Sequence, residues 1–238
     1  MLHDIDGEIK LGDTLSGVGK SMSGYDVVLT NPPFGTKKGG ERPSRDDLTF
    51  LTSNKQLNFL QHIYRSLNRD GKARAAVVVP DNVLFQDGDG QRIREDLLNK
   101  CNLHTILRLP TGIFYAQGVK TNVLFFTRGT TEKDNTKEVA FYDMRTNMEN
   151  LGKTNPLTEK HFEEFETSVN SSKEEKQKIE RWSIFTIEEI KAKNFNLDLG
   201  LIRDDSVISH EDLPDPVESA EMAIGKLEEA IDLISEVA

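Results

Sequence analysis

Apolar residues along the chain follow two patterns, uninterrupted short runs and a helical spacing. Five runs, several rich in β-branched residues, predict strands at 25–30, 75–79, 105–109, 122–127 and 139–144. Between the first two runs, apolar residues three or four apart predict a helix that ends near Gly71, and a second helix covers about 91–100. Strands that alternate with helices predict an α/β fold, with a parallel or mixed sheet covered by helices on both faces.

The character of the sequence changes after Arg145. Residues 147–185 are charged and carry few apolar anchors, and Thr186 opens a short helix with a capping box. The apolar residues of a last helix, at about 216–238, are spaced alternately by four and three, as in a coiled-coil seam. This seam packs either onto its own domain or onto helices of a partner. We therefore expect two parts, residues 1–145 and a charged, partly helical tail at 146–238.

The composition of the chain limits the kinds of function and of binding site that it can have. The net charge of −10 over 238 residues leaves no overall basic footprint for duplex DNA, so a role on nucleic acid would depend on a partner that grips the DNA. The single cysteine, Cys101, excludes an internal disulfide and fits a reducing cytoplasm. No Cys/His cluster has metal-ligand spacing, and no apolar run has the length of a membrane span, so we expect neither a metal site nor a membrane segment.

The most informative stretch is Asn31-Pro32-Pro33-Phe34. It follows the run at 25–30, which we expect to be a buried parallel strand, and the two prolines must end that strand at once. The loop lies where open α/β sheets bind ligands, at the carboxyl end of a strand. An amide, free carbonyls and an aromatic ring together suit a flat heterocycle that carries an amino group. The alternative is a strand terminator with a core phenylalanine. Residues 35–53 are polar and predict a mobile loop beside this site.

Two other motifs predict no site. The segment 17–21 looks like a phosphate-binding loop, but Thr14 stands where that motif needs its first glycine. The segment 87–90 resembles part of a calcium loop but lacks the closing glutamate, which favours a surface turn.

The Asn31–Phe34 motif resembles the catalytic motif of amino-group methyltransferases, and Gly12-Asp13-Thr14-Leu15 matches the segment that usually precedes it. Narrower blocks follow at 53–57, 77–85 and 107–126. Over residues 1–150 the chain is similar to the modification (M) subunit of type I restriction–modification enzymes, which are DNA adenine-N6 methyltransferases that use S-adenosylmethionine. The resemblance implies a Rossmann-like methyltransferase fold with strand order 3-2-1-4-5-7-6, of which this chain holds strand 3 onward, and a C-terminal helical appendage.

The resemblance also implies roles for individual residues. The Asn31 side chain and the Pro32 carbonyl would accept the two N6 hydrogens of a flipped adenine, with Pro33 stiffening the loop. Phe34 and Phe114 would stack on the two faces of the base. Asp13, within the Gly12–Leu15 segment that includes Thr14, would accept a hydrogen bond from the adenine ring of S-adenosylmethionine. An Asx turn that closes a short strand at 9–11 is the alternative for Asp13.

The chain departs from this family upstream of Asn31. The glycine-rich turn that holds the methionine part of the cofactor, and the acidic strand end that follows it, have no counterpart in the first thirty residues. We therefore expect a gap in the sheet and an inactive chain when it stands alone. The implied partners are DNA, a specificity (S) subunit, a second M subunit and restriction (R) subunits. A non-catalytic assembly fragment, and a protein-glutamine or RNA methyltransferase, remain alternatives.

Overall fold

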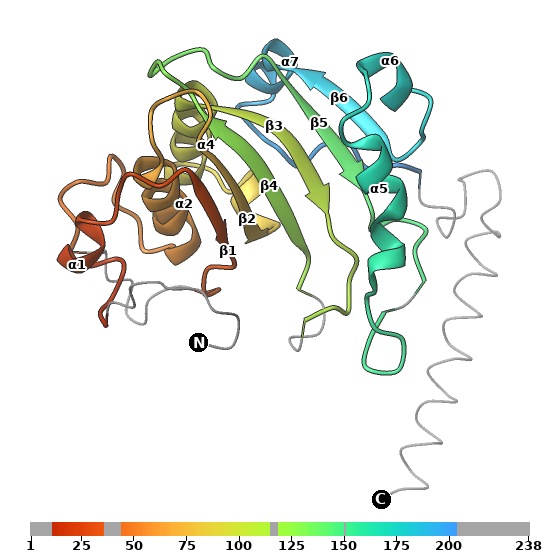
Figure 1. Ribbon diagram of the computed structural model, residues 1–238, viewed down its shortest axis with the longest axis horizontal. Helices are drawn as coiled ribbons and strands as arrows, with labels where there is room; N and C mark the ends of the chain where they lie inside the picture. Colours follow the sequence, from red (N-terminus) through yellow and green to blue (C-terminus); the bar gives the residue numbers. More distant parts are fainter. Residues whose placement is uncertain (1–10, 36–43, 115–118, 150, 204–238) are drawn as a thin grey trace, which may run out of the picture. The chain divides into compact units, whose positions relative to one another are not determined.

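Six strands form one mixed sheet in the order β1-β2-β4-β3-β5-β6 (Figure 1). The computed structural model describes residues 11–35, 44–114, 119–149 and 151–203. The strands are β1 Val27–Thr30, β2 Arg74–Pro80, β3 Cys101–Arg108, β4 Thr121–Arg128, β5 Glu138–Asp143 and β6 Trp182–Thr186. The pairs β1–β2 and β3–β5 are parallel, whereas β4 is antiparallel to both of its neighbours and β6 to β5. The order β1-β2-β4-β3 reproduces the 4-5-7-6 part of the expected methyltransferase sheet.

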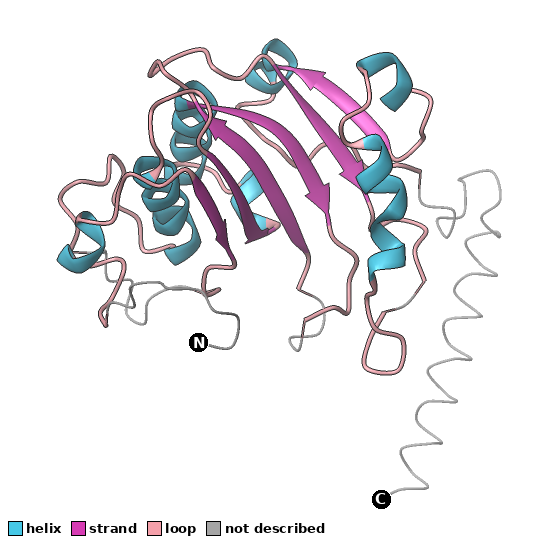
Figure 2. Ribbon diagram, in the orientation of Figure 1, coloured by secondary structure: helices cyan, strands magenta, loops and turns pink. Residues whose placement is uncertain are grey.

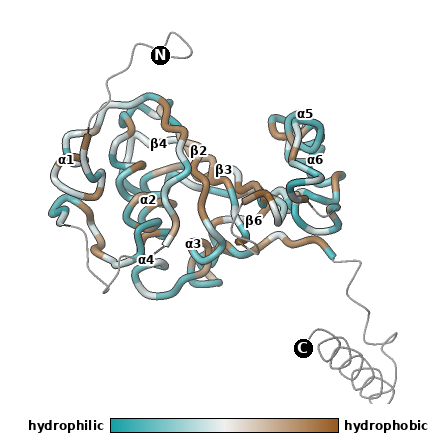
Figure 3. The backbone as a smooth tube through the Cα atoms, turned by 90° about the horizontal axis from the view of Figure 1, so that it is seen from below, coloured by the Kyte–Doolittle hydropathy of each residue, from teal (hydrophilic) through white to brown (hydrophobic). Residues whose placement is uncertain are grey.

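The two faces of the sheet are covered by different helices (Figure 2). The helices are α1 Gly17–Lys20, α2 Lys55–Ser66, α3 Asn82–Phe85, α4 Asp89–Lys100, η2 Glu159–Phe162, α5 Glu163–Ser168, α6 Lys173–Lys176 and α7 Ile187–Ala192. On one face α2, α4 and α7 enclose the larger apolar core with alternate residues of β2 to β5. On the other face, η2 and α5 cover a smaller core that includes Trp182 and Phe165. Figure 3 shows the apolar sequence concentrated in the central strands between these layers.

The structure confirms the strands predicted between residues 25 and 144 and the helices predicted between them, with small shifts at their ends. The first helix, α2, ends at Ser66 rather than at Gly71, because Leu67 turns to extended backbone and bridges Tyr25. The strand β3 begins at Cys101, directly after α4, and so starts four residues before the predicted run. Cys101 is buried, and burial raises the pKa of its thiol to about 12, which makes it a packed and unreactive residue.

The strand before the Asn-Pro-Pro-Phe motif was expected to be buried, and this expectation is wrong for the described chain. β1 lies at the end of the sheet, where Val27 is 46% and Leu29 76% exposed, because no described strand pairs with its outer edge. Leu11 of the expected strand at 9–11 is in a coil and fully exposed, and residues 9 and 10 lie outside the described residues. The six described strands are continuous, so the expected gap is not between any of them.

The segment after Arg145 is part of the same compact unit, contrary to the expected boundary at 145. β6 adds a strand to the sheet beside β5, and the compact unit extends to Ile202. The capping box at Thr186 is confirmed, since its side chain and that of Glu189 cap α7 reciprocally. The expected helix at 216–238 lies outside the described residues. Among the residues that are described, no helix is long and apolar enough to cross a membrane.

Candidate active site

The Asn31–Phe34 loop follows the carboxyl end of β1, which is the outermost described strand on one side of the sheet. Pro32 is buried and anchors the loop, whereas Asn31, Pro33 and Phe34 are exposed. Within the described part of the chain, neither the Asn31 amide nor the Pro32 carbonyl has a hydrogen-bond partner. Two acceptors at the loop are therefore available to a ligand, which is what recognition of an amino group requires.

The two aromatic residues expected to sandwich a base lie together. The ring centroids of Phe34 and Phe114 are 5.9 Å apart, and the ring planes meet at 65° in an edge-to-face contact. A base between two rings needs roughly 7–8 Å between parallel planes, twice the usual carbon–carbon contact distance. The two rings therefore fill the space between them, and one must turn or move before a base can enter.

Arg145 fastens both ends of the loop that carries Phe114. Its Nε donates to the Leu109 carbonyl (3.1 Å), and its Nη2 donates to the Thr121 carbonyl (2.8 Å). The backbone N–H of Leu109 also donates to the Thr121 carbonyl, which closes the base of the loop. Within the loop, Gly112 adopts a φ of +83°, and a Cβ there would lie 2.1 Å from the carbonyl oxygen of Leu151. Only glycine fits this turn.

Asp81, directly after β2, holds Arg145 in place. The two side chains form a bidentate ion pair with distances of 2.8 and 2.9 Å, and Asn122 donates a further hydrogen bond to Asp81 (2.7 Å). Burial by itself would raise the pKa of Asp81, but the hydrogen bonds from Arg145 and Asn122 outweigh it and hold the pKa below its usual value. Asp81 is therefore ionised at neutral pH, and the pair links β2 to the Phe114 loop.

The first turn of α2 holds the other end of the Asn31–Phe34 loop. With its amide in the orientation that satisfies both ends, the buried Gln56 donates to the Gly35 carbonyl (3.2 Å) and accepts from the Gly35 N–H. Gly35 has a φ of +115°, a conformation that side chains beyond glycine rarely adopt. The chain thus turns sharply just after Phe34, and Gln56 satisfies the backbone groups of the turn.

The Gly12–Leu15 segment forms a tight turn before α1. The Leu15 N–H donates to Asp13 Oδ1 (2.8 Å), so the Asx turn considered for Asp13 is present. The other carboxylate oxygen, Oδ2, has no hydrogen-bond partner among the described residues, and Asp13 is exposed. The turn therefore leaves Asp13 able to accept one further hydrogen bond, while Leu15 is buried beneath it.

Arg45 holds the Gly12–Leu15 segment in place. Its Nη1 donates to the Thr14 carbonyl (2.9 Å), and its guanidinium pairs with Asp47 through two contacts of 2.6 Å. Arg45 is 2% exposed. The hydrogen bond from Arg45 holds the pKa of Asp47 far below its usual range, and burial together with Arg45 lowers the pKa of His62 to about 4. His62 is therefore neutral at physiological pH, and the charges of this network are those of Arg45, Asp47 and Arg65.

The expected mobile loop at 35–53 is ordered over its second half, and that expectation is wrong for residues 44–53, where Arg45, Leu48 and Thr52 are buried. Residues 36–43 lie outside the described residues. Arg45, Gln56 and Arg145 support the site but were not predicted from the sequence. Gln56 lies in the block at 53–57 that resembles the family, so the sequence contained a signal that this position matters. The other two residues give no local signal for their role, because the site-loop carbonyls that they bind lie far away in the sequence. No group of three or more metal-ligating side chains occurs among the described residues.

Comparisons with known proteins agree on one family. A profile of the N-6 DNA methylase family matches residues 1–211. The chain is 44% identical to the EcoKI type I restriction enzyme methylase subunit of Escherichia coli K12 and 43% identical to the StySPI methylase subunit of Salmonella potsdam, in both cases over 97% of this chain. Among solved structures, the EcoKI M protein superposes with a TM-score of 0.74 at 41% identity over the whole of this chain and 56% of that chain.

A more distant structure, the type I methyltransferase subunit of Streptococcus thermophilus, has a TM-score of 0.62 at 27% identity and covers 78% of this chain and 40% of that chain. The chain covers 51% of the EcoKI and StySPI sequences. It therefore spans about half the length of the curated relatives that it matches.

Proposed function

Because the chain belongs to the N-6 DNA methylase family, we propose that it forms part of a site-specific DNA methyltransferase that transfers a methyl group from S-adenosylmethionine to N6 of adenine. The observation that carries the proposal is the pair of unpartnered acceptors at Asn31 and Pro32 next to two aromatic rings. Identity to DNA methylases along nearly the whole chain favours this activity over transfer to RNA or to protein glutamine.

Asn31 and Pro32 activate the amino group. The adenine N6 lone pair is delocalised into the ring, so the nitrogen is a weak nucleophile. Hydrogen bonds from its two hydrogens to the Asn31 side-chain oxygen and the Pro32 carbonyl draw N6 toward tetrahedral geometry and free the lone pair. This is positioning with electrostatic stabilisation, and it needs no covalent intermediate.

Phe34 and Phe114 hold the flipped base. A base inside a duplex cannot reach Asn31, so it leaves the helix and stacks in the site. Since the two rings now contact each other, entry of the base replaces one ring–ring contact by two ring–base contacts. We propose that the Phe114 ring moves, while Phe34 stays on the loop fixed by Pro32 and Gln56.

Asp13 is the residue that we assign to binding the cofactor. The carboxylate oxygen left over by the Asx turn suits the exocyclic amino group of an adenine ring, and Leu15 and the anchored Thr14 keep the turn in place. When bound, S-adenosylmethionine supplies the electrophilic methyl group. The residues that would hold its methionine part do not appear among the described ones.

DNA, a specificity subunit, a second modification subunit and restriction subunits are the proposed partners. The net charge of −10 supports a division of labour in which another subunit contributes most of the phosphate contacts. The half-length coverage supports the view that the methyltransferase needs the other half of the relatives' sequence as well. A reducing cytoplasm is the proposed location, consistent with the buried thiol of Cys101.

Asn31→Ala in the complete methylase subunit, meaning this chain joined to the part that its relatives carry in addition, tests the proposal. We expect loss of adenine methylation with nearly unchanged S-adenosylmethionine binding, because Asn31 contacts the base and not the cofactor. Gln177→Ala, which removes an exposed amide without a side-chain partner, is the matched control. Methylation by Asn31→Ala at the rate of the unmodified protein would refute the assignment.

A further inference from the structure

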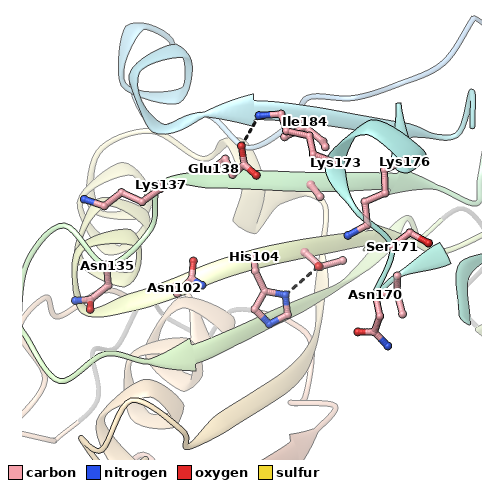
Figure 4. Close-up of a pocket in the computed structure, with 13 residues that line it drawn as sticks. Asn102, His104, Asn135, Lys137, Glu138, Asn170, Ser171, Lys173, Lys176 and Ile184 are labelled. Carbon is pink, nitrogen blue, oxygen red and sulfur yellow. Dashed lines mark hydrogen bonds and ion pairs between the residues drawn. The ribbon is translucent and has the colours of Figure 1, made fainter. Parts of the chain in front are cut away.

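A pocket lies at the end of the strands opposite to the Asn31–Phe34 loop. It opens near the amino ends of β3 and β5, on the face that carries α5 and α6, and has a volume of about 370 Å³ (Figure 4). Its polar walls come from three separate parts of the chain: Asn102 and His104 of β3, Lys137 and Glu138 at the start of β5, and Asn170, Ser171, Lys173 and Lys176 around α6. Ala140, Val169 and Ile184 form its apolar part.

Positive charge exceeds negative charge in this pocket. Lys173 pairs with Glu138, the one carboxylate among the described lining residues, so that pair is neutral overall. Lys137 and Lys176 have no carboxylate partner within salt-bridge distance in the described part of the chain. Partial desolvation and the nearby Lys176 lower the pKa of His104, so this exposed residue is a neutral hydrogen-bonding group near pH 7. The net charge of the lining is about +2 at that pH.

Several polar groups in the pocket also lack partners. Within the described part of the chain, the side chains of Asn102, Asn170 and Ser171 make no hydrogen bond. His104 uses one ring nitrogen, Nδ1, on the hydroxyl of the buried Thr105 (2.9 Å), which leaves Nε2 available. Figure 4 shows Lys176, Ser171 and Asn170 on one side of the pocket, next to the strand that carries His104.

We propose that this pocket binds a phosphate group. A tetrahedral anion has several acceptor oxygens, and the pocket offers an ammonium, a hydroxyl and amide donors without competing carboxylates other than the paired Glu138. The volume exceeds that of phosphate alone, so a substituent of the phosphate can lie on Ala140, Val169 and Ile184. The phosphate group comes either from free phosphate compounds or from the backbone of a nucleic acid strand.

The single tryptophan provides a reporter beside the pocket. Lys176 Nζ lies 4.7 Å from the centroid of the Trp182 ring, and the Trp182 indole is fixed by a hydrogen bond to Ser168 (2.8 Å). An anion that draws Lys176 toward itself changes the environment of the indole. The experiment therefore titrates the 238-residue chain with inorganic phosphate at constant ionic strength, and follows the heat of binding by calorimetry and the Trp182 emission in parallel.

We expect saturable binding in the millimolar range or tighter, with a matching change in emission. Lys176→Met and Asn170→Asp should each weaken binding about tenfold or more, since the first removes a charge-assisted hydrogen bond and the second adds a repelling carboxylate. Calorimetry is decisive for Lys176→Met, which also alters the reporter. Lys178→Met, on an exposed side chain outside the pocket, is the control for the loss of one positive charge and should bind as the original chain does.

A short single-stranded oligonucleotide distinguishes the two sources. Tighter binding than phosphate, weakened by Asn170→Asp, supports a nucleic acid backbone as the natural ligand. A response to phosphate alone supports a free phosphate compound. Absence of saturable binding by both probes, or equal binding by Asn170→Asp and the original chain, would overturn the proposal.

Discussion

Replacement of Arg145 by methionine should destabilise the protein and release the loop that carries Phe114. The change keeps much of the side-chain volume but removes the guanidinium that binds Asp81 and the carbonyls of Leu109 and Thr121. Loss of one partner of a buried ion pair costs about 3–5 kcal/mol. Because the Arg145 and Asp81 side chains are 10% and 19% exposed, solvent offsets part of this, and we expect a loss of about 3 kcal/mol.

Urea unfolding followed by Trp182 fluorescence at low protein concentration measures this loss. With a slope of about 2–3 kcal/mol per M urea, the midpoint should fall by about 1–1.5 M. The double variant Asp81→Asn/Arg145→Met should regain part of the stability, since it no longer leaves a charge unpaired. A midpoint shift below about 0.3 M for Arg145→Met would show that the ion pair contributes little and would refute the reasoning.

The same pair has a defined pH dependence. The folded protein lowers the pKa of Asp81, so the contribution of the pair is complete above the pKa of an unfolded aspartate, about 3.9, and is lost as the pH falls through the folded value. The difference in stability between Arg145→Met and the original chain should therefore be constant near neutral pH and should shrink below about pH 4. An undiminished difference at lower pH would contradict this assignment.

Two further predictions concern base capture and the isolated chain. In the complete methylase subunit, Phe114→Ala should weaken capture of the flipped base by about 1 kcal/mol, because a base–aromatic stack of about 1–3 kcal/mol is lost and a ring–ring contact of about 0.5–1.5 kcal/mol no longer has to break. Phe114→Trp should be tolerated. Base flipping is measured by the fluorescence of 2-aminopurine at the target position, and an unchanged signal in the alanine variant would make Phe114 a packing residue only. The 238-residue chain by itself should not bind S-adenosylmethionine appreciably and should self-associate through β1, where Val27 and Leu29 are exposed. Calorimetry measures the binding, and light scattering measures the self-association. Micromolar binding to a monomer would show that the cofactor site has been misplaced.

Local patterns in the sequence were sufficient for most elements of the fold. Uninterrupted apolar runs and helical spacing depend on neighbouring residues, and they identified α2, α4 and the strands β1 to β5. The capping box at Thr186 identified α7 for the same reason. The short helices α1, α3, η2, α5 and α6 were not predicted. β6 was also missed, because its Trp182–Thr186 sequence is short and follows a charged segment, and only pairing with β5 makes it a strand.

The sequence also determined which residues form the candidate site, through the strand that ends at two prolines and through the family resemblance. Phe34 and Phe114 are 80 positions apart in the sequence, and only the tertiary structure shows that their rings touch and occupy the space that the base would need. The exposure of β1 was likewise decided by strand order, since the same run of residues would be buried if strands lay on both sides.

The burial of the supporting residues was decided by tertiary structure alone. Arg45, Gln56 and Arg145 are polar residues whose surroundings in the sequence give no sign of burial, yet each is buried or nearly so and binds backbone groups of a site loop. A polar side chain is buried when distant segments supply its hydrogen bonds, and no local pattern records which segments these are. The sequence thus predicted the residues of the candidate site, and the packing of distant segments determined what holds those residues in place.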